Sequence, residues 1–177
     1  MRLPVIAGLA LALAGLDVTS AVAQQPPAGG VAAVRPLYDR LKGLFIKSVA
    51  QMPEDGFSFK PTPAVRSFGE QLAHVANENY LFCAAALGQE NPNKTDFEKT
   101  PTKAVLGRAI AESFAYCDAV YRMDEAKALE ETNFFGTKGT RLWIVIYNVT
   151  HDSEHYGSLV TYFRLKGMVP PSSQSGG

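Results

Sequence analysis

The chain has 177 residues, with 17 acidic and 17 basic side chains and no net formal charge. This length is that of one ordinary domain, which can bury a hydrophobic core without help from disulfides. Because the charges balance and no run of lysine and arginine alternates with aromatic residues, the sequence disfavours a nucleic-acid partner.

Residues 1–23 are predicted to be a cleavable secretory signal peptide. Arg2 precedes an apolar run over residues 3–16, and residues 21–23 are small, as at a cleavage site. The apolar run is too short to span a bilayer comfortably, so we expect no stable membrane anchor. The mature protein is therefore predicted to begin near Gln24 and to be periplasmic or secreted.

The mature chain is predicted to open with a flexible linker and a helix. Residues 24–33 are rich in glutamine, proline and glycine, a composition typical of linkers. Apolar residues then recur at helical spacing until Pro53, which predicts the first helix over residues 34–52. Residues 53–66 contain three prolines and are predicted to form an irregular loop.

A capping-box pattern predicts where the second helix begins. Ser67 and Glu70 have the spacing at which each side chain bonds the backbone N–H of the other. The helix is predicted to end at Leu87, because Gly88 is suited to the left-handed conformation that closes a helix. A third helix is predicted over residues 104–123.

The rest of the chain completes an all-α, four-helix bundle. Residues 124–131 are predicted to form a short helical turn, residues 133–140 a loop, and residues 141–166 the fourth long helix. The bundle is predicted to occupy residues 34–172, and residues 173–177 are predicted to be a disordered tail. No segment has a pattern that convincingly predicts a β-strand.

Cys83 and Cys117 are the only two cysteines. We expect them to be small buried hydrophobic residues without a bond between them. The alternative is a disulfide, because an exported protein meets oxidants.

The chain has only three histidines, and their spacing predicts a metal site. His151 and His155 are four residues apart, so on a helix their Cβ atoms lie about 5–6 Å apart on one face. His74, in the second helix, would supply a third nitrogen. Three protein ligands with an open position are typical of catalytic zinc sites. We therefore predict a divalent ion, with Zn²⁺ or Ni²⁺ preferred, although imidazole also binds copper and iron.

The run from His151 to His155 also matches the H-x-x-E-H pattern of inverzincin peptidases, in which the Glu is the general base. Two observations disfavour this alternative. Only a short tail follows His155 to supply a further acidic ligand, and Glu154 lies on the flank of the histidine face. We interpret Glu154 or Asp152 as groups that support the site or face solvent.

Four further side chains share faces with the histidines and are candidates for orienting substrate or ligands: Glu78, Asn148, Ser158 and Tyr162. Of these, Glu78 and Tyr162 are the candidate catalytic residues. Glu78 could alternatively close the site as a fourth ligand, and core packing explains Tyr162 equally well.

Two segments carry a family resemblance. Residues 155–172, HYGSLVTYFRLKGMVPPS, resemble the final helix of DinB-like proteins and the segment that follows it. Residues 67–74, SFGEQLAH, resemble the segment that contains the first histidine of those proteins. Nearly all of the mature chain is similar to this DinB/YfiT four-helix superfamily. The resemblance implies an up-down-down-up bundle, an ion held by His74, His151 and His155, and frequently a homodimer.

Characterised members of that superfamily include thiol-dependent transferases and isomerases. The leading hypothesis is an exported metal-binding protein that acts on a small-molecule substrate as a metal-dependent hydrolase or a thiol-dependent transferase. Two alternatives stay open. One is a non-catalytic protein that binds a metal or small ligand, and the other is a helical bundle without a metal.

Overall fold

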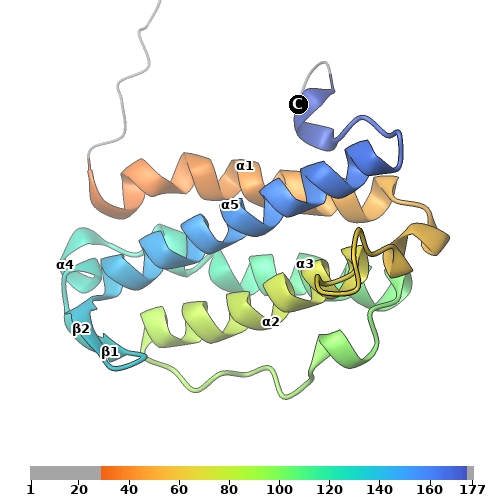
Figure 1. Cartoon of the computed structure of the whole chain (residues 1–177). Helices are drawn as coiled ribbons and strands as arrows, with labels where there is room; N and C mark the ends of the chain where they lie inside the picture. Colours follow the sequence, from red (N-terminus) through yellow and green to blue (C-terminus); the bar gives the residue numbers. More distant parts are fainter. Residues whose placement is uncertain (1–28, 175–177) are drawn as a thin grey trace, which may run out of the picture.

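The computed structural model describes residues 29–174, which form a helical bundle with one small hairpin (Figure 1). The helices are α1 (Gly30–Gln51), α2 (Phe68–Leu87), α3 (Lys103–Cys117), α4 (Glu125–Ala128) and α5 (Arg141–Leu165), and the strands are β1 (Glu131–Phe134) and β2 (Thr137–Thr140). The predicted signal peptide, residues 24–28 of the predicted linker and residues 175–177 lie outside the described residues. Residues 30–33, which were predicted to belong to the linker, are part of α1.

The four long helices have the up-down-down-up arrangement. Figure 1 shows α1 and α5 running in one direction and α2 and α3 in the other. Helix α2 packs against α3 and α5, and α1 packs against α5 and α3. Because α2 and α3 run parallel, the connection between them, residues 88–102, must return along the whole bundle (Figure 1). The predicted all-α class is confirmed.

The predicted capping box of α2 is present. Ser67 Oγ accepts a hydrogen bond from the Glu70 backbone N–H at 3.1 Å, and Glu70 Oε2 accepts one from the Ser67 N–H at 2.7 Å. Gly88 closes the helix with φ of 71°, in the left-handed region that glycine reaches without steric cost. These local signals fix both ends of the helix that carries His74.

Several predicted boundaries differ from the structure. Helix α1 begins at Gly30, four residues before the predicted start. Helix α3 ends at Cys117, and a 3₁₀ turn at Val120–Arg122 replaces the end of the predicted third helix. The short helical turn predicted over residues 124–131 is present as α4.

The prediction that residues 133–140 form a loop is wrong, because β1 and β2 pair there as an antiparallel hairpin. Phe134 pairs with Thr137, which leaves a turn of two residues, Phe135 and Gly136. Both have positive φ, 50° and 77°, as the tight hairpin turns require. The strands are only four residues long and lack clean apolar alternation, so their sequence gives little strand signal.

The expectation of two unbonded cysteines is also wrong. A disulfide joins Cys83 of α2 to Cys117 at the end of α3, with their Cα atoms 5.3 Å apart. Both cysteines are buried. The physical reason is the parallel packing of α2 on α3, which brings together residues that are 34 positions apart in the sequence.

Within residues 29–174, no helix combines the length and the apolar character that a membrane crossing needs. The apolar side chains of the long helices instead meet in one core, whose largest fully buried members include Tyr38, Phe45, Phe68, Phe114 and Phe163. Helices α2 and α5 are held against each other by this core.

Candidate metal centre

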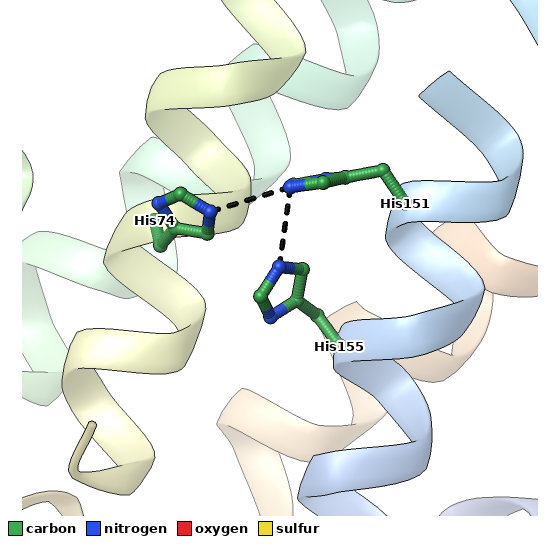
Figure 2. Close-up of side chains that lie close together, drawn as sticks. All are labelled: His74, His151 and His155. Atoms are coloured by element: carbon green, nitrogen blue, oxygen red, sulfur yellow. Dashed lines mark hydrogen bonds between the residues drawn. The ribbon is translucent and has the colours of Figure 1, made fainter. Parts of the chain in front are cut away.

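The three histidines meet between α2 and α5. His151 Nε2 lies 3.3 Å from His74 Nε2 and 3.1 Å from His155 Nε2 (Figure 2). The three ligand atoms lie within 4.8 Å of one another. The structure thus brings together the three residues that the sequence singled out, although His74 lies 77 positions from His151 in the sequence.

Helix geometry explains this convergence. His151 and His155 are one turn apart on α5 and point toward α2, while His74 points back from α2 (Figure 2). His74 lies in the second turn of a helix whose start is fixed by the capping box. The site therefore depends on how α2 and α5 pack, as well as on each helix alone.

Hydrogen bonds orient two of the three imidazoles. Glu98 Oε1 lies 3.1 Å from His74 Nδ1, and Gln71 Oε1 lies 2.6 Å from His155 Nδ1. Because both partners are acceptors, each histidine carries its proton on Nδ1 and donates it. Their Nε2 atoms are then unprotonated, with lone pairs directed at the centre of the cluster. Carboxylate and amide partners of this kind are typical of metal-binding histidines.

The third imidazole is oriented by packing. The Phe82 ring meets the His151 ring edge-on, with centroids 5.1 Å apart and an interplanar angle of 86°. Within the described residues, His151 Nδ1 is buried and has no hydrogen-bond partner. This ring is therefore held by its aromatic neighbour rather than by an acceptor.

The charge state of the cluster favours a cation. Burial lowers the pKa of His151 to about 3 and the pKa of His155 to about 4, and charge on the neighbouring histidines acts in the same direction. Both imidazoles are therefore neutral at pH 7, which is the form that binds metals. If His151 Nε2 carries a proton, that proton can bond to only one of the two lone pairs that face it, on His74 Nε2 and His155 Nε2. A cation, by contrast, can bind the lone pairs of all three Nε2 atoms. The residues present thus fit a divalent ion.

Tyr162 does not contact the three histidines directly, but a series of contacts connects it to His74. Its hydroxyl donates to the Arg66 carbonyl at 2.7 Å. The Arg66 guanidinium lies 3.3 Å from Glu98 Oε2, and Glu98 in turn accepts from His74. Tyr162 is buried and packs edge-on against Phe59. The structure therefore gives Tyr162 a role in holding the loop that positions Glu98.

Glu78 does not join the cluster in the structure, because the group of ligand atoms within 4.8 Å contains only the three histidines. Its side chain is partly buried, and burial raises the pKa of its carboxyl group. The acidic partner of His74 is Glu98, in a 3₁₀ turn at Phe97–Lys99 of the long α2–α3 connection. Sequence reasoning missed Glu98, since no helical spacing relates it to His74.

Asn148 and Ser158 also lie outside the cluster. Asn148 is buried in the core, where it accepts a hydrogen bond from Tyr121 at 2.7 Å and donates one to Asn79 at 2.7 Å. The Ser158 hydroxyl donates to the Glu154 carbonyl at 3.5 Å. Asn148 is thus a structural residue, and Ser158 borders the site only through the cleft described next.

A polar cleft of about 570 Å³ opens beside His155. Its walls include two ion-paired cations, Lys60 and Arg66, and the exposed Glu154. Lys60 pairs with Glu70 at 2.9 Å. The cleft gives a small polar molecule access to one side of the three-histidine cluster. Asp152, the other acidic neighbour considered from the sequence, is fully buried and faces away from solvent.

Comparison with known proteins places this geometry in a family. The family model of the DinB superfamily matches residues 37–159. The chain belongs to the DinB superfamily. The match covers most of α1, all of α2 and α3, and the part of α5 that carries His151 and His155, so it includes every residue of the cluster. No curated protein matches the chain.

Solved structures show the same fold as this DinB-superfamily chain. A DinB-like protein from Bacillus cereus ATCC 10987 aligns over 80% of this chain and 96% of its own, with a TM-score of 0.68 and 13% identity. A DinB-like protein from Bacillus subtilis aligns over 80% and 98%, with a TM-score of 0.61 and 21% identity. A conserved protein from Enterococcus faecalis aligns over 74% and 93%, with a TM-score of 0.61 and 19% identity. At these identities the likeness concerns the fold alone.

Proposed function

We propose that this DinB-superfamily protein binds one divalent ion, with Zn²⁺ or Ni²⁺ preferred, through His74, His151 and His155. We further propose that it uses the ion as a hydrolase or thiol-dependent transferase of a small-molecule substrate. The observation that carries the proposal is the convergence of three Nε2 lone pairs, two of them fixed by acceptors on Nδ1. Imidazole ligands carry no charge of their own when they bind a metal, so three of them would leave the full charge on the ion and one coordination position available for substrate or water.

The surrounding residues have separable tasks in this proposal. The ion would supply Lewis acidity, which lowers the pKa of a water or polarises a substrate carbonyl. Glu98 and Gln71 hold two ligands in the metal-binding tautomer. The cleft beside His155 admits the substrate, and its cations, Lys60 and Arg66, are already neutralised by Glu70 and Glu98. The cleft therefore favours a polar substrate without a large net charge.

We also propose that the protein is exported and forms a homodimer. Export is supported by the predicted signal peptide together with the disulfide between Cys83 and Cys117, a bond that forms and persists in oxidising compartments. The homodimer rests on the family resemblance. Sedimentation of the mature protein tests it.

The first experiment measures metal content by elemental mass spectrometry on the mature protein, purified without a histidine tag. We expect about one equivalent of divalent metal in the wild type and loss of it in both His74→Ala and His151→Ala. Glu112→Ala, an exposed change on α3, serves as the control and should keep the metal. Chelator should also lower the melting temperature of the wild type, because a ligand at 100 times its Kd stabilises the folded state by about 2.7 kcal/mol.

The metal-loaded protein is then assayed with 4-nitrophenyl esters for hydrolysis and with glutathione plus 1-chloro-2,4-dinitrobenzene for thiol transfer. Turnover that disappears in His151→Ala supports the catalytic proposal. If the wild-type protein takes up no divalent ion, the catalytic proposal is wrong. Metal that binds tightly but never supports turnover of any substrate class favours the non-catalytic binding protein instead.

A further inference from the structure

An aromatic wall adjoins the metal centre on the side away from the polar cleft. We define this wall by five side chains from the end of α2, the hairpin and the start of α5: Phe82, Phe134, Phe135, Trp143 and Tyr147. None of the five is charged, which distinguishes this side of the centre from the cleft beside His155.

The wall is continuous from the hairpin turn to a metal ligand. Successive ring centroids are 4.2 Å apart for Phe135 and Phe134, 6.2 Å for Phe134 and Trp143, and 5.6 Å for Trp143 and Tyr147. Tyr147 then meets Phe82 at 5.2 Å. The Phe82 ring completes the series by packing against the His151 ring at 5.1 Å.

Part of the wall is exposed although it is aromatic. Phe135 is 69% exposed and Tyr147 is 41% exposed, while Phe82 and Phe134 behind them are buried. Single exposed hydrophobic side chains are common, but a connected set that ends on a metal ligand is not explained by chance scatter. The buried members give the exposed members a rigid base.

Helical spacing places Trp143 and Tyr147 in the two turns of α5 that precede His151, each step rotated by about 40° from the one before. Trp143, Tyr147, His151 and His155 follow one another at intervals of four residues along α5. Each interval advances about 6 Å along the helix axis, so Tyr147 lies about 6 Å and Trp143 about 12 Å from the level of His151. A ligand bound at the centre must therefore extend about 6 Å along the helix to reach the level of Tyr147 and about 12 Å to reach that of Trp143.

The backbone of Phe135 is a second, independent indication. Among residues 29–174, Phe135 is the only non-glycine residue with positive φ. The first position of this two-residue turn favours Asn, Asp or Gly, and a bulky side chain there is strained. The chain nevertheless has an exposed phenylalanine at this place, and strain of this kind is found where a side chain serves a site.

We propose that the aromatic wall binds an aromatic or similarly flat apolar group of the substrate, while the polar end of the same substrate lies at the three-histidine centre. This inference rests on the proposed function, because it assigns a substrate class to that site. Along α5, Trp143 and Tyr147 precede His151, whereas the cleft residues Glu154 and Ser158 follow it. The substrate expected is therefore a small molecule with one flat apolar end and one polar end.

The test compares two hydroxamates on zinc-loaded protein, since both chelate zinc and only one carries rings. By calorimetry, we expect 4-phenylbenzohydroxamate to bind at least tenfold more tightly than acetohydroxamate. Trp143 is the only tryptophan in the chain, so a change in its fluorescence with the aryl ligand alone locates that ligand at the wall. Tyr147→Ala should reduce the affinity ratio to below threefold.

Two further variants separate binding from folding. Phe135→Asn places the residue that the turn favours, so we expect an unchanged or higher melting temperature together with a reduced affinity ratio. Ile146→Ala removes an exposed apolar side chain from the neighbouring position on α5 and should leave the ratio unchanged. A lower ratio in Phe135→Asn without loss of stability cannot come from unfolding.

Three outcomes overturn the proposal. The first is an affinity ratio near one in the wild type, and the second is a ratio that the wall variants leave intact. The third is a dimer that Phe135→Asn dissociates without changing the ratio, which would make the wall an interface between copies of the chain. If zinc or acetohydroxamate itself fails to bind, the failure lies in the proposed function and not in the wall.

Discussion

At the scale of single residues, the geometry of the three-histidine cluster depends on the group that orients each imidazole. Glu98 bonds His74 Nδ1, and Gln71 bonds His155 Nδ1, while His151 relies on the ring of Phe82. An acceptor on Nδ1 fixes the tautomer and raises the basicity of Nε2. The two acceptors are therefore as much a part of the site as the ligands are.

Glu98 and Glu78 offer a matched pair for testing whether an acceptor on Nδ1 contributes to metal affinity. We expect Glu98→Ala to weaken zinc affinity about 10–100-fold, the range found when such partners of metal-binding histidines are removed. Glu78→Ala removes a carboxylate on the same helix face as His74 and should change the affinity by less than threefold. Competition titrations with a chromophoric zinc chelator measure both. Equal losses in the two variants would contradict a specific role of Glu98.

The convergence of the three histidines was predictable from the sequence, but the groups that orient them were only partly so. His151 and His155 share a helix, and their spacing alone places them on one face. Gln71 shares the face of His74, as helical spacing predicts, yet its partner is His155 on the other helix. Glu98 reaches the site through a long connection whose path no local pattern specifies. Contacts within a helix are readable from spacing, whereas contacts between segments need the packing.

At the scale of elements, α2 is the helix whose ends are best determined. Its capping box satisfies backbone donors of the first turn, and its glycine closes the last turn. The sequence predicted both ends because these signals are local. The hairpin was missed for the converse reason. Its turn, Phe135-Gly136, departs from the usual Asn-Gly pattern, and its strands are too short to show a period.

Removing the cap should weaken the whole domain. Ser67→Ala deletes the side-chain acceptor at the start of α2, and we expect a loss of about 1 kcal/mol in the free energy of unfolding. Urea denaturation in the presence of chelator measures the loss without a contribution from bound metal. Ser58→Ala, which deletes an exposed hydroxyl in the 3₁₀ turn at Glu54–Ser58 before α2, is the control and should cost much less.

The charge of Glu70 adds a pH dependence. The hydrogen bond from the Ser67 backbone, and then the Lys60 side chain, lower the pKa of Glu70 in the folded protein. Its contribution is therefore present above the unfolded pKa of about 4.3 and is lost as the pH falls through the folded value. Glu70→Gln should be less stable than the wild type at pH 7, and the difference should shrink as the pH falls below the unfolded pKa and through the lowered folded pKa. A difference that is constant over this range would argue against a role for the charge.

At the scale of the whole molecule, the disulfide joins the two parallel helices. It closes a segment of 34 residues in the unfolded chain, for which loop-closure entropy gives about 4 kcal/mol. We expect the double variant Cys83→Ala/Cys117→Ala to lose about this much stability in urea denaturation. Wild-type protein with its disulfide reduced should lose a similar amount. If the oxidised wild type and the double variant unfold at the same urea concentration, the expected stabilisation by the disulfide is contradicted.

The same bond has a consequence for proteolysis. The α2–α3 connection lies between Cys83 and Cys117, and it exposes Lys94, whose side chain is 70% accessible. A trypsin cut there would separate the fragment that carries His74 from the fragment that carries His151 and His155, yet the disulfide would keep the two covalently joined. The nicked protein should therefore migrate as one chain without reductant and as two chains with it. Until the bond is reduced, the two fragments should keep His74, His151 and His155 together in one molecule.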